Sequence, residues 1–105
     1  MTGLAFDPRS VPSPAFVVDE GLLRANAAVL NRVRRATGCK ILLALKAFAM
    51  WSAFGPLREV LDGTCASSPH EARLGREEFG GEVHVFSAAY SEASLAGILP
   101  LADHL

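Results

Sequence analysis

The sequence is poor in cysteine and has no long hydrophobic run. Only Cys39 and Cys65 occur in 105 residues. Because small secreted domains depend on several disulfides, this low count predicts reduced thiols and a cytoplasmic protein. No apolar segment is long enough to cross a bilayer, and the start of the chain lacks the basic patch and apolar run of a signal peptide. We therefore expect no membrane association.

An excess of charge of either sign is also missing. Ten Lys and Arg residues stand against eleven Asp and Glu residues, which leaves a formal net charge of −1. This balance gives no electrostatic basis for binding nucleic acid or an anionic membrane. Arg32, Arg34 and Arg35 do cluster, but they fall in the expected last turn of a helix. There they would complement the helix dipole, and we interpret them as a solvated face.

Several common catalytic motifs are absent. His70, His84 and His104 have no metal-ligand spacing among themselves or with the cysteines, so we predict no metal site. Gly80-Gly81 ends an expected helix instead of opening one after a strand, which excludes a phosphate-binding loop there. No GxSxG motif surrounds Ser67-Ser68, so a serine hydrolase has no support.

What the chain does contain is an alternation of strand and helix patterns at roughly twenty-residue spacing, which is typical of βαβ units in a parallel sheet. The expected strands cover residues 15–18, 39–46, 64–67 and 82–87, and the expected helices cover residues 19–37, 50–61, 68–79 and 91–100. Residues 103–105 resemble the start of a further strand. A closed (β/α)₈ barrel needs roughly 250 residues. We therefore expect an α/β fold, in which residues 15–105 form the N-terminal portion of a TIM-type barrel and begin with a short strand. Residues 1–14, rich in Pro, Gly and Ser, should form an extended segment that precedes the barrel.

Two of the expected helices have an apolar face, and capping residues mark where helices begin and end. Asp19 is a suitable N-cap and Gly38 a suitable C-cap for the first helix. Its expected buried face comprises Leu22, Asn26, Val29, Leu30 and Val33. The expected buried face of residues 50–61 comprises Trp51, Phe54, Leu57 and Leu61, with Pro56 either kinking the helix or delaying its start. Residues 68–71, Ser-Pro-His-Glu, form a capping box.

The segment from Lys40 to Trp51 carries the clearest chemical feature. The apolar run 41–45 predicts a strand buried on both faces, with a short buried helix as the alternative. Lys46 ends this run, at the edge where parallel sheets bind ligands, and Phe48 and Trp51 follow it. Since desolvation lowers the pKa of an amine, one interpretation is a partly desolvated Schiff-base lysine. The other is a strand-end lysine whose stem lies on apolar surface, and the pattern by itself favours this second interpretation.

Ser67 and Glu71 are two further polar residues near an expected strand end. Ser67 directly follows a strand, where hydroxyl groups face the mouth of a barrel. Glu71 would suit an active-site acid, but the capping box already explains it.

Several consecutive segments resemble carboxynorspermidine/carboxyspermidine decarboxylases. They are Lys-Ile-Leu-Leu-Ala-Leu-Lys-Ala-Phe-Ala-Met-Trp at 40–51, Asp-Gly-Thr at 62–64, Ala-Ser-Ser at 66–68, Glu-Ala-Arg-Leu-Gly-Arg-Glu-Glu-Phe-Gly at 71–80 and Glu-Val-His-Val at 82–85. These enzymes belong to the alanine-racemase-like, ornithine-decarboxylase-like class of pyridoxal phosphate (PLP) proteins. Their fold is a TIM-type barrel joined to a C-terminal β-domain, and they work as homodimers with active sites at the subunit interface.

The resemblance implies a lyase of polyamine (norspermidine or spermidine) biosynthesis. Lys46 would form the Schiff base with PLP, and Ala44, Ala66 and Ser67 would lie at or near the cofactor. The reaction would convert carboxynorspermidine or carboxyspermidine to norspermidine or spermidine and CO₂. The resemblance covers an N-terminal piece only, so the phosphate loop, the acid that partners the pyridine nitrogen and the C-terminal domain would lie beyond Leu105. We expect the isolated chain to bind PLP poorly and to be inactive.

Other interpretations stay open. The chain could be an alanine-racemase-like enzyme or a PLP-carrier protein of the same fold. It could also be a non-catalytic half-barrel that pairs with another chain.

Overall fold

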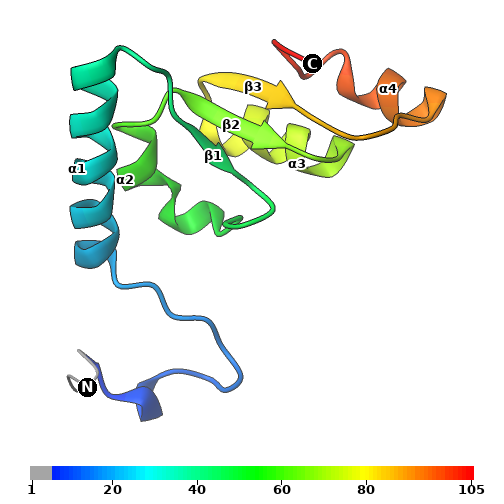
Figure 1. Cartoon of the computed structure of the whole chain (residues 1–105). Helices are drawn as coiled ribbons and strands as arrows, with labels where there is room; N and C mark the ends of the chain where they lie inside the picture. Colours follow the sequence, from blue (N-terminus) through cyan, green and yellow to red (C-terminus); the bar gives the residue numbers. More distant parts are fainter. Residues whose placement is uncertain (1–5) are drawn as a thin grey trace.

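The computed structural model describes residues 6–105 and shows a small parallel α/β fold (Figure 1). The sheet has three strands in the order β1-β2-β3, namely β1 (Leu42–Ala44), β2 (Gly63–Ala66) and β3 (Glu82–Val85). Both strand pairs are parallel, as the alternation of patterns predicted. No helix among residues 6–105 has the length and apolar character needed to cross a membrane.

The helix before the sheet, α1 (Glu20–Thr37), begins and ends where the sequence predicts. The Asp19 carboxylate accepts a hydrogen bond from the Leu22 amide at 3.0 Å. Gly38 adopts a left-handed conformation with φ 72° and donates its amide to the Arg34 carbonyl. Glycine adopts that φ without a Cβ clash, so the C-cap follows directly from the residue type.

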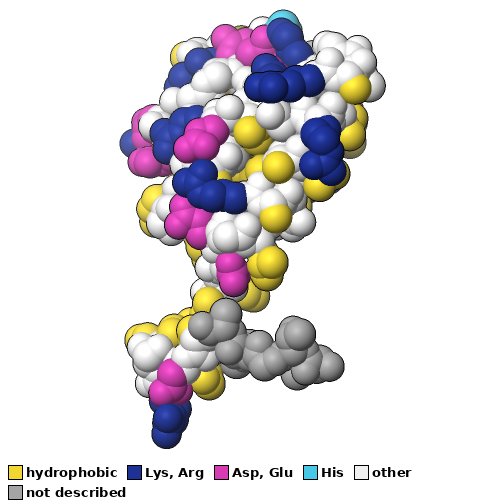
Figure 2. Space-filling view, turned by 90° about the vertical axis from the view of Figure 1, so that its left-hand side faces the viewer, with side chains coloured by type: hydrophobic (Ala, Val, Ile, Leu, Met, Phe, Trp, Pro, Cys, Tyr) yellow, Lys and Arg dark blue, Asp and Glu magenta, His cyan; other side chains and the backbone are white. Residues whose placement is uncertain are grey.

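The predicted buried face of α1 is wrong. Ala27 is the only buried residue of the helix, and Leu23 beside it is partly buried in the same cluster. The apolar side chains of the predicted face are 39–66% exposed, namely those of Leu22, Val29, Leu30 and Val33. Figure 2, which views the molecule from the side where α1 lies, shows apolar side chains at the surface among Lys and Arg side chains. The small Ala27 side chain lets α1 approach α2 closely. The side of α1 that carries Ala27 is therefore buried, and the more apolar side that carries Val29 and Val33 is not.

The predicted helix 50–61 is shorter than expected. It forms as a 3₁₀ turn, η2 (Trp51–Ala53), followed by α2 (Phe54–Arg58). Pro56 lies in the first turn of α2, where no intrahelical amide bond is lost, so the late start is the correct alternative. Phe54, Leu57 and Leu61 are buried as predicted, whereas Trp51 is 65% exposed because it precedes the helix that carries this face.

The helix that follows β2 is α-helical in its first part and π-helical in its second part. Segment α3 (Pro69–Leu74) has Ser68 as its N-cap, as predicted, and the Ser68 hydroxyl accepts the Glu71 amide at 3.2 Å. The predicted capping box is only half formed, because Glu71 Oε1 has no partner among the described residues. Segment α3 continues as a π-helical turn, η3 (Gly75–Phe79). A Cβ at Gly75 would collide with the Thr64 hydroxyl of β2. Glycine at this position therefore allows the close contact between helix and strand.

The last part of the chain follows the predicted order. Helix α4 (Glu92–Ile98) is capped by Ser91, which accepts the Ser94 amide at 3.0 Å. Beyond it, His104 forms a parallel bridge with His84 of β3, as expected for residues that begin a further strand.

The predicted strand at residues 15–18 does not form. These residues have no regular structure, and the Phe16 side chain is 94% exposed. A strand needs a neighbour to accept its hydrogen bonds, and none of the described residues pairs with this segment. Of the expected extended segment 1–14, residues 1–5 lie outside the described part, and a 3₁₀ turn, η1 (Pro8–Ser10), interrupts the remainder.

Two hydrophobic clusters form the core. The first joins α1, α2 and η3 to the end of β1 and contains Ala27, Leu45, Phe54, Leu57, Leu61 and Phe79. The second joins β2 and β3 to α3 and α4 and contains Ala66, Ala72, Val83, Val85 and Ile98. The helices thus bury one face of the sheet.

Candidate functional site

The sheet has a helix-covered face and an opposite face, which we call the open face. Thr64, Ala66, Val83 and Val85 alternate along β2 and β3 and are buried on the helix-covered side. The residues between them point the other way. Two rows of register partners therefore lie on the open face: Leu42, Gly63 and Glu82 form the first, and Ala44, Cys65 and His84 the second.

Lys46 lies in a turn at the carboxyl end of β1. The amides of Ala47 and Phe48 donate to the Ala44 carbonyl at 3.0 and 3.2 Å, so the strand ends sooner than predicted. Leu45, 2% exposed, anchors this turn in the core, while Lys46 itself is exposed. Within this chain, the exposure of Lys46 agrees with the interpretation as a strand-end lysine and not with that of a partly desolvated one. Its amine is free to meet a carbonyl compound from solvent.

Ser67 lies at the same edge of the sheet as Lys46. Each stands two residues beyond the register pair Ala44 and Cys65, and both are exposed. Ala44 lies just below Lys46, and its carbonyl holds the turn. Ala66 differs from the other predicted site residues, because its side chain is fully buried against the helices and its carbonyl accepts the Phe86 amide at 3.0 Å.

An apolar cavity of about 350 Å³ adjoins the turn that follows Lys46. It is lined by residues 16–18 of the N-terminal segment and by residues 47–50. The residues that directly follow Lys46 thus border space that an apolar group can fill.

One buried polar atom near this edge has no partner. Glu71 Oε1 is inaccessible to solvent and accepts no hydrogen bond from any described residue. A buried acceptor of this kind calls for a donor, which a bound group could supply.

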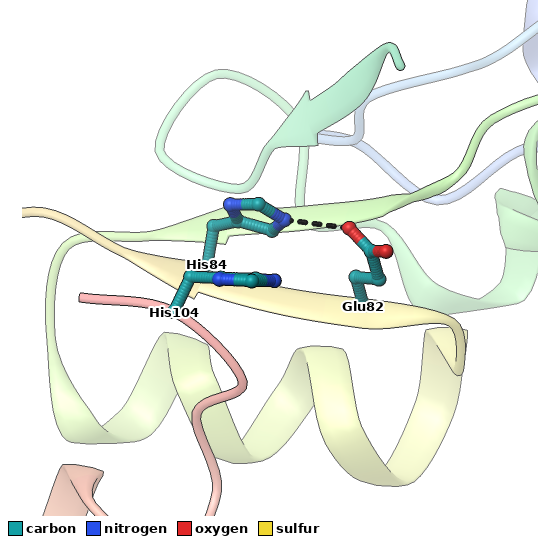
Figure 3. Close-up of side chains that lie close together, drawn as sticks. All are labelled: Glu82, His84 and His104. Carbon is teal, nitrogen blue, oxygen red and sulfur yellow. Dashed lines mark hydrogen bonds and ion pairs between the residues drawn. The ribbon is translucent and has the colours of Figure 1, made fainter.

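The open face also carries a polar cluster that sequence reasoning missed. His84 Nε2 lies 2.8 Å from Glu82 Oε2, and the rings of His84 and His104 stack with centroids 4.4 Å apart (Figure 3). The other Glu82 oxygen accepts from the Lys40 ammonium. This hydrogen bond, and then the one with His84, holds the pKa of Glu82 below its usual value, while Glu82 raises the pKa of Lys40.

A signal for part of this cluster was present in the sequence. Glu82 and His84 stand two residues apart on an expected strand, and this spacing places them on one face. No spacing rule connects them to His104, which reaches the cluster only through the parallel bridge to His84.

The interpretation of the arginine cluster as a solvated face is wrong for Arg34. Its Nη2 lies 2.7 Å from Asp62 Oδ1, and its Nε lies 2.9 Å from Asp62 Oδ2. Asp62 also accepts the Ile41 amide at 2.8 Å. The Arg34 hydrogen bond, and then that of Ile41, lowers the pKa of Asp62 from 3.8 to about 2. This pair ties the end of α1 to the start of the sheet below the Lys46 turn.

The sequence of the chain is similar to those of several known decarboxylases. No protein-family model matches the chain. The chain is 47% identical over 96 residues to a carboxyaminopropylagmatine decarboxylase from Synechocystis, with 91% of this chain and 25% of that protein aligned. It is 37% identical over 95 residues to a carboxynorspermidine/carboxyspermidine decarboxylase from Herminiimonas arsenicoxydans, with 90% and 26% aligned.

A solved structure agrees with these sequence relatives. The crystal structure of carboxynorspermidine decarboxylase from Campylobacter jejuni, complexed with norspermidine, superposes with a TM-score of 0.84 at 35% identity. The match covers 90% of this chain and 26% of that one, which fits part of a barrel. The chain spans about a quarter of the length of the relatives it matches. By sequence and by fold, the chain is thus similar to about a quarter of a carboxynorspermidine/carboxyspermidine decarboxylase.

Proposed function

We propose that this chain supplies the cofactor lysine, Lys46, of a PLP-dependent decarboxylase that acts on a carboxylated polyamine in polyamine biosynthesis. The exposed Lys46 amine at the carboxyl edge of a parallel sheet is the observation that carries this proposal. The names of the relatives support it, because each is a decarboxylase of a carboxylated polyamine or agmatine derivative.

The residues present fit the cofactor. PLP needs a primary amine to bind its aldehyde carbon, and Lys46 offers one that no described residue pairs with. Ser67 offers an exposed hydroxyl at the same edge, and Ala44 sets the turn that presents Lys46. Ala66 would not contact the cofactor through its side chain, which is buried, and would only support the neighbouring Ser67. The unpaired Glu71 Oε1 leaves an acceptor for a further donor.

The chemistry divides between the cofactor and Lys46. When bound, PLP supplies an electron sink for the electron pair that CO₂ leaves on the α-carbon. Lys46 would hold the cofactor through its Nζ and would be set free when the substrate amine takes its place. The released Lys46 Nζ is then a base at the reaction centre, where it can hold or deliver the proton that replaces CO₂.

The rest of the site is proposed to lie outside these residues. In the family, the phosphate-binding loop and the acid for the pyridine nitrogen lie beyond the aligned part, and the active sites form at a homodimer interface. We therefore expect the 105-residue chain alone to bind PLP weakly and to show no decarboxylase activity.

The test is cofactor trapping in a chimera. This chain replaces the aligned quarter of the Campylobacter jejuni enzyme, PLP is added, and borohydride reduction is followed by peptide mass mapping. Lys40 is the matched control, because Lys40 and Lys46 are the only lysines of this chain. We expect a pyridoxyl adduct on Lys46 and none on Lys40. Lys46→Arg should abolish the adduct and the activity, and Lys40→Arg should keep both.

Two results would contradict the proposal. An adduct spread equally over both lysines would show surface chemistry only. A chimera that stays folded, takes up no PLP and forms a stable oligomer would support the non-catalytic half-barrel instead.

A second substrate is favoured by one observation. The relative at 47% identity is named for carboxyaminopropylagmatine, not for carboxynorspermidine. Comparing kcat/KM of the active chimera for the two compounds tests whether this quarter of the protein contributes to the choice. If the ratio of the two kcat/KM values equals that of the Campylobacter jejuni enzyme, the residues that select the substrate lie outside this quarter of the protein.

A further inference from the structure

We propose that Glu82, His84 and His104 form a binding site for a divalent transition-metal ion of the zinc, cobalt or nickel class. The site is independent of the proposed PLP chemistry, because it lies on β3 and the residues after α4 and not in the Lys46 turn. One ligand atom from each residue lies within 4.8 Å of the other two. Two imidazoles and a carboxylate are a donor set that binds these ions.

The backbone brings the three side chains together. Glu82 and His84 share the open face because they are two residues apart on β3. His104 is placed next to His84 by the parallel bridge. Asp103, which precedes His104, holds this bridge in place. Its carboxylate accepts hydrogen bonds from the Val83 amide at 2.8 Å and from the Arg76 guanidinium at 2.7 Å. The site therefore rests on strand backbone and an anchored turn, not on a free loop.

To bind an ion, the side chains must rotate and His84 must release the proton that its Nε2 shares with the Glu82 carboxylate, because a metal ion takes the unprotonated imidazole nitrogen. His84 Nε2 and Glu82 Oε2 lie 2.8 Å apart, whereas two ligands on one tetrahedral ion are roughly 3.3 Å apart, so a small separation of the two side chains makes room for the ion. The His84 and His104 rings are stacked with an interplanar angle of 30°, so the exposed His104 ring must tilt to direct a nitrogen at the same point. Figure 3 shows both rings beside the Glu82 carboxylate.

Lys40 is the charged group that opposes metal binding here. Its ammonium bonds the second Glu82 oxygen and would repel a nearby cation. Because its side chain is 62% exposed, it can move into water when an ion binds. Removing this charge should therefore strengthen metal binding, an effect that a purely structural Glu82–His84 pair would not produce.

The experiment is a cobalt titration of the untagged, metal-stripped 105-residue chain, followed by visible absorption and by displacement with zinc. We expect a visible band that saturates at one ion per chain. Loss of a group that only orients a ligand costs about 10- to 100-fold in metal affinity. His104→Ala and Glu82→Gln, which remove a ligand, should therefore each weaken binding by at least ~10-fold.

His70→Ala is the matched control, because His70 is exposed and is not among the clustered residues. It should bind cobalt like the parent chain, and Lys40→Met should bind more tightly. The proposal is overturned if the parent chain shows no band at millimolar cobalt. It is equally overturned if His70→Ala weakens binding as much as His104→Ala, or if neither His104→Ala nor Glu82→Gln weakens it. His104 is exposed and Glu82→Gln keeps the shape of the side chain, so both variants should stay folded.

Discussion

At the residue scale, the pair Arg34 and Asp62 joins parts of the chain that are far apart in sequence. Asp62 has three hydrogen bonds from Arg34 and one from the Ile41 amide, and its side chain is only 14% exposed. These bonds exist only in the folded state and only with an ionised carboxylate. They therefore make the stability of the chain depend on pH.

The first prediction is a loss of stability in acid. The pKa of Asp62 falls from 3.8 to about 2 on folding, so the unfolded chain takes up a proton more readily than the folded one. The contribution of ionised Asp62 to the free energy of unfolding is complete above pH ~4 and is lost as the pH falls through ~2. Urea unfolding between these pH values should show it. Asp62→Asn should be less stable at neutral pH and should show a flatter pH profile, whereas Glu20→Gln, at an exposed pair, should keep the parent profile.

The second prediction concerns the buried hydroxyl of Thr64. Thr64 is fully buried, and its Oγ1 has no hydrogen-bond partner among the described residues. Thr64→Val keeps the shape and removes the unpaired group, so we expect the free energy of unfolding to rise by about 1 kcal/mol. Thr64→Ser retains the hydroxyl and serves as the control. A destabilised Thr64→Val variant would show that the hydroxyl is bonded in solution.

At the element scale, α1 shows the difference between a helix and its packing. The caps at Asp19 and Gly38 depend on residues within one turn, and both formed as predicted. The buried strip depends on which side of the helix meets α2, and the pattern along α1 selected the wrong side. Val29 and Leu30 remain exposed while the smaller Ala27 is buried.

The third prediction tests this orientation of α1. Ala27→Lys places a long, charged side chain where α1 meets the core, and should lower the free energy of unfolding by at least about 1–3 kcal/mol. Val29→Lys, on the exposed side, should change it by no more than about 0.5 kcal/mol. Chemical unfolding of the two variants compares them directly. The opposite order would mean that the predicted face is the packed one.

At the scale of the whole molecule, the chain is extended for its length. Its radius of gyration is 16.0 Å, against about 13 Å for a compact domain of 100 residues. The N-terminal segment projects away from the body, as Figure 1 shows, and several large apolar side chains are exposed, among them Phe16, Trp51 and Phe86. With so little buried surface, stability rests on a few core side chains.

The fourth prediction compares two aromatic residues of one segment. Phe54 is fully buried, and its ring lies 5.3 Å from that of Phe79 and 6.5 Å from that of Phe48. Phe54→Ala should cost about 3–5 kcal/mol, enough to unfold much of a marginally stable chain. Trp51→Ala, at an exposed position, should cost less than about 0.5 kcal/mol. Equal losses would place Trp51 in the core.

The sequence by itself determined the alternation of helix and strand after residue 19, both ends of α1, the start of α3 and the position of Lys46 after a strand, because these depend on residues a few positions apart. Only the tertiary structure decided which strip of α1 is buried and that residues 15–18 find no strand partner. It also decided that Glu82 and His84 meet His104. The physical reason is that burial and clustering arise from contacts between distant segments, and a local pattern does not specify which segments meet.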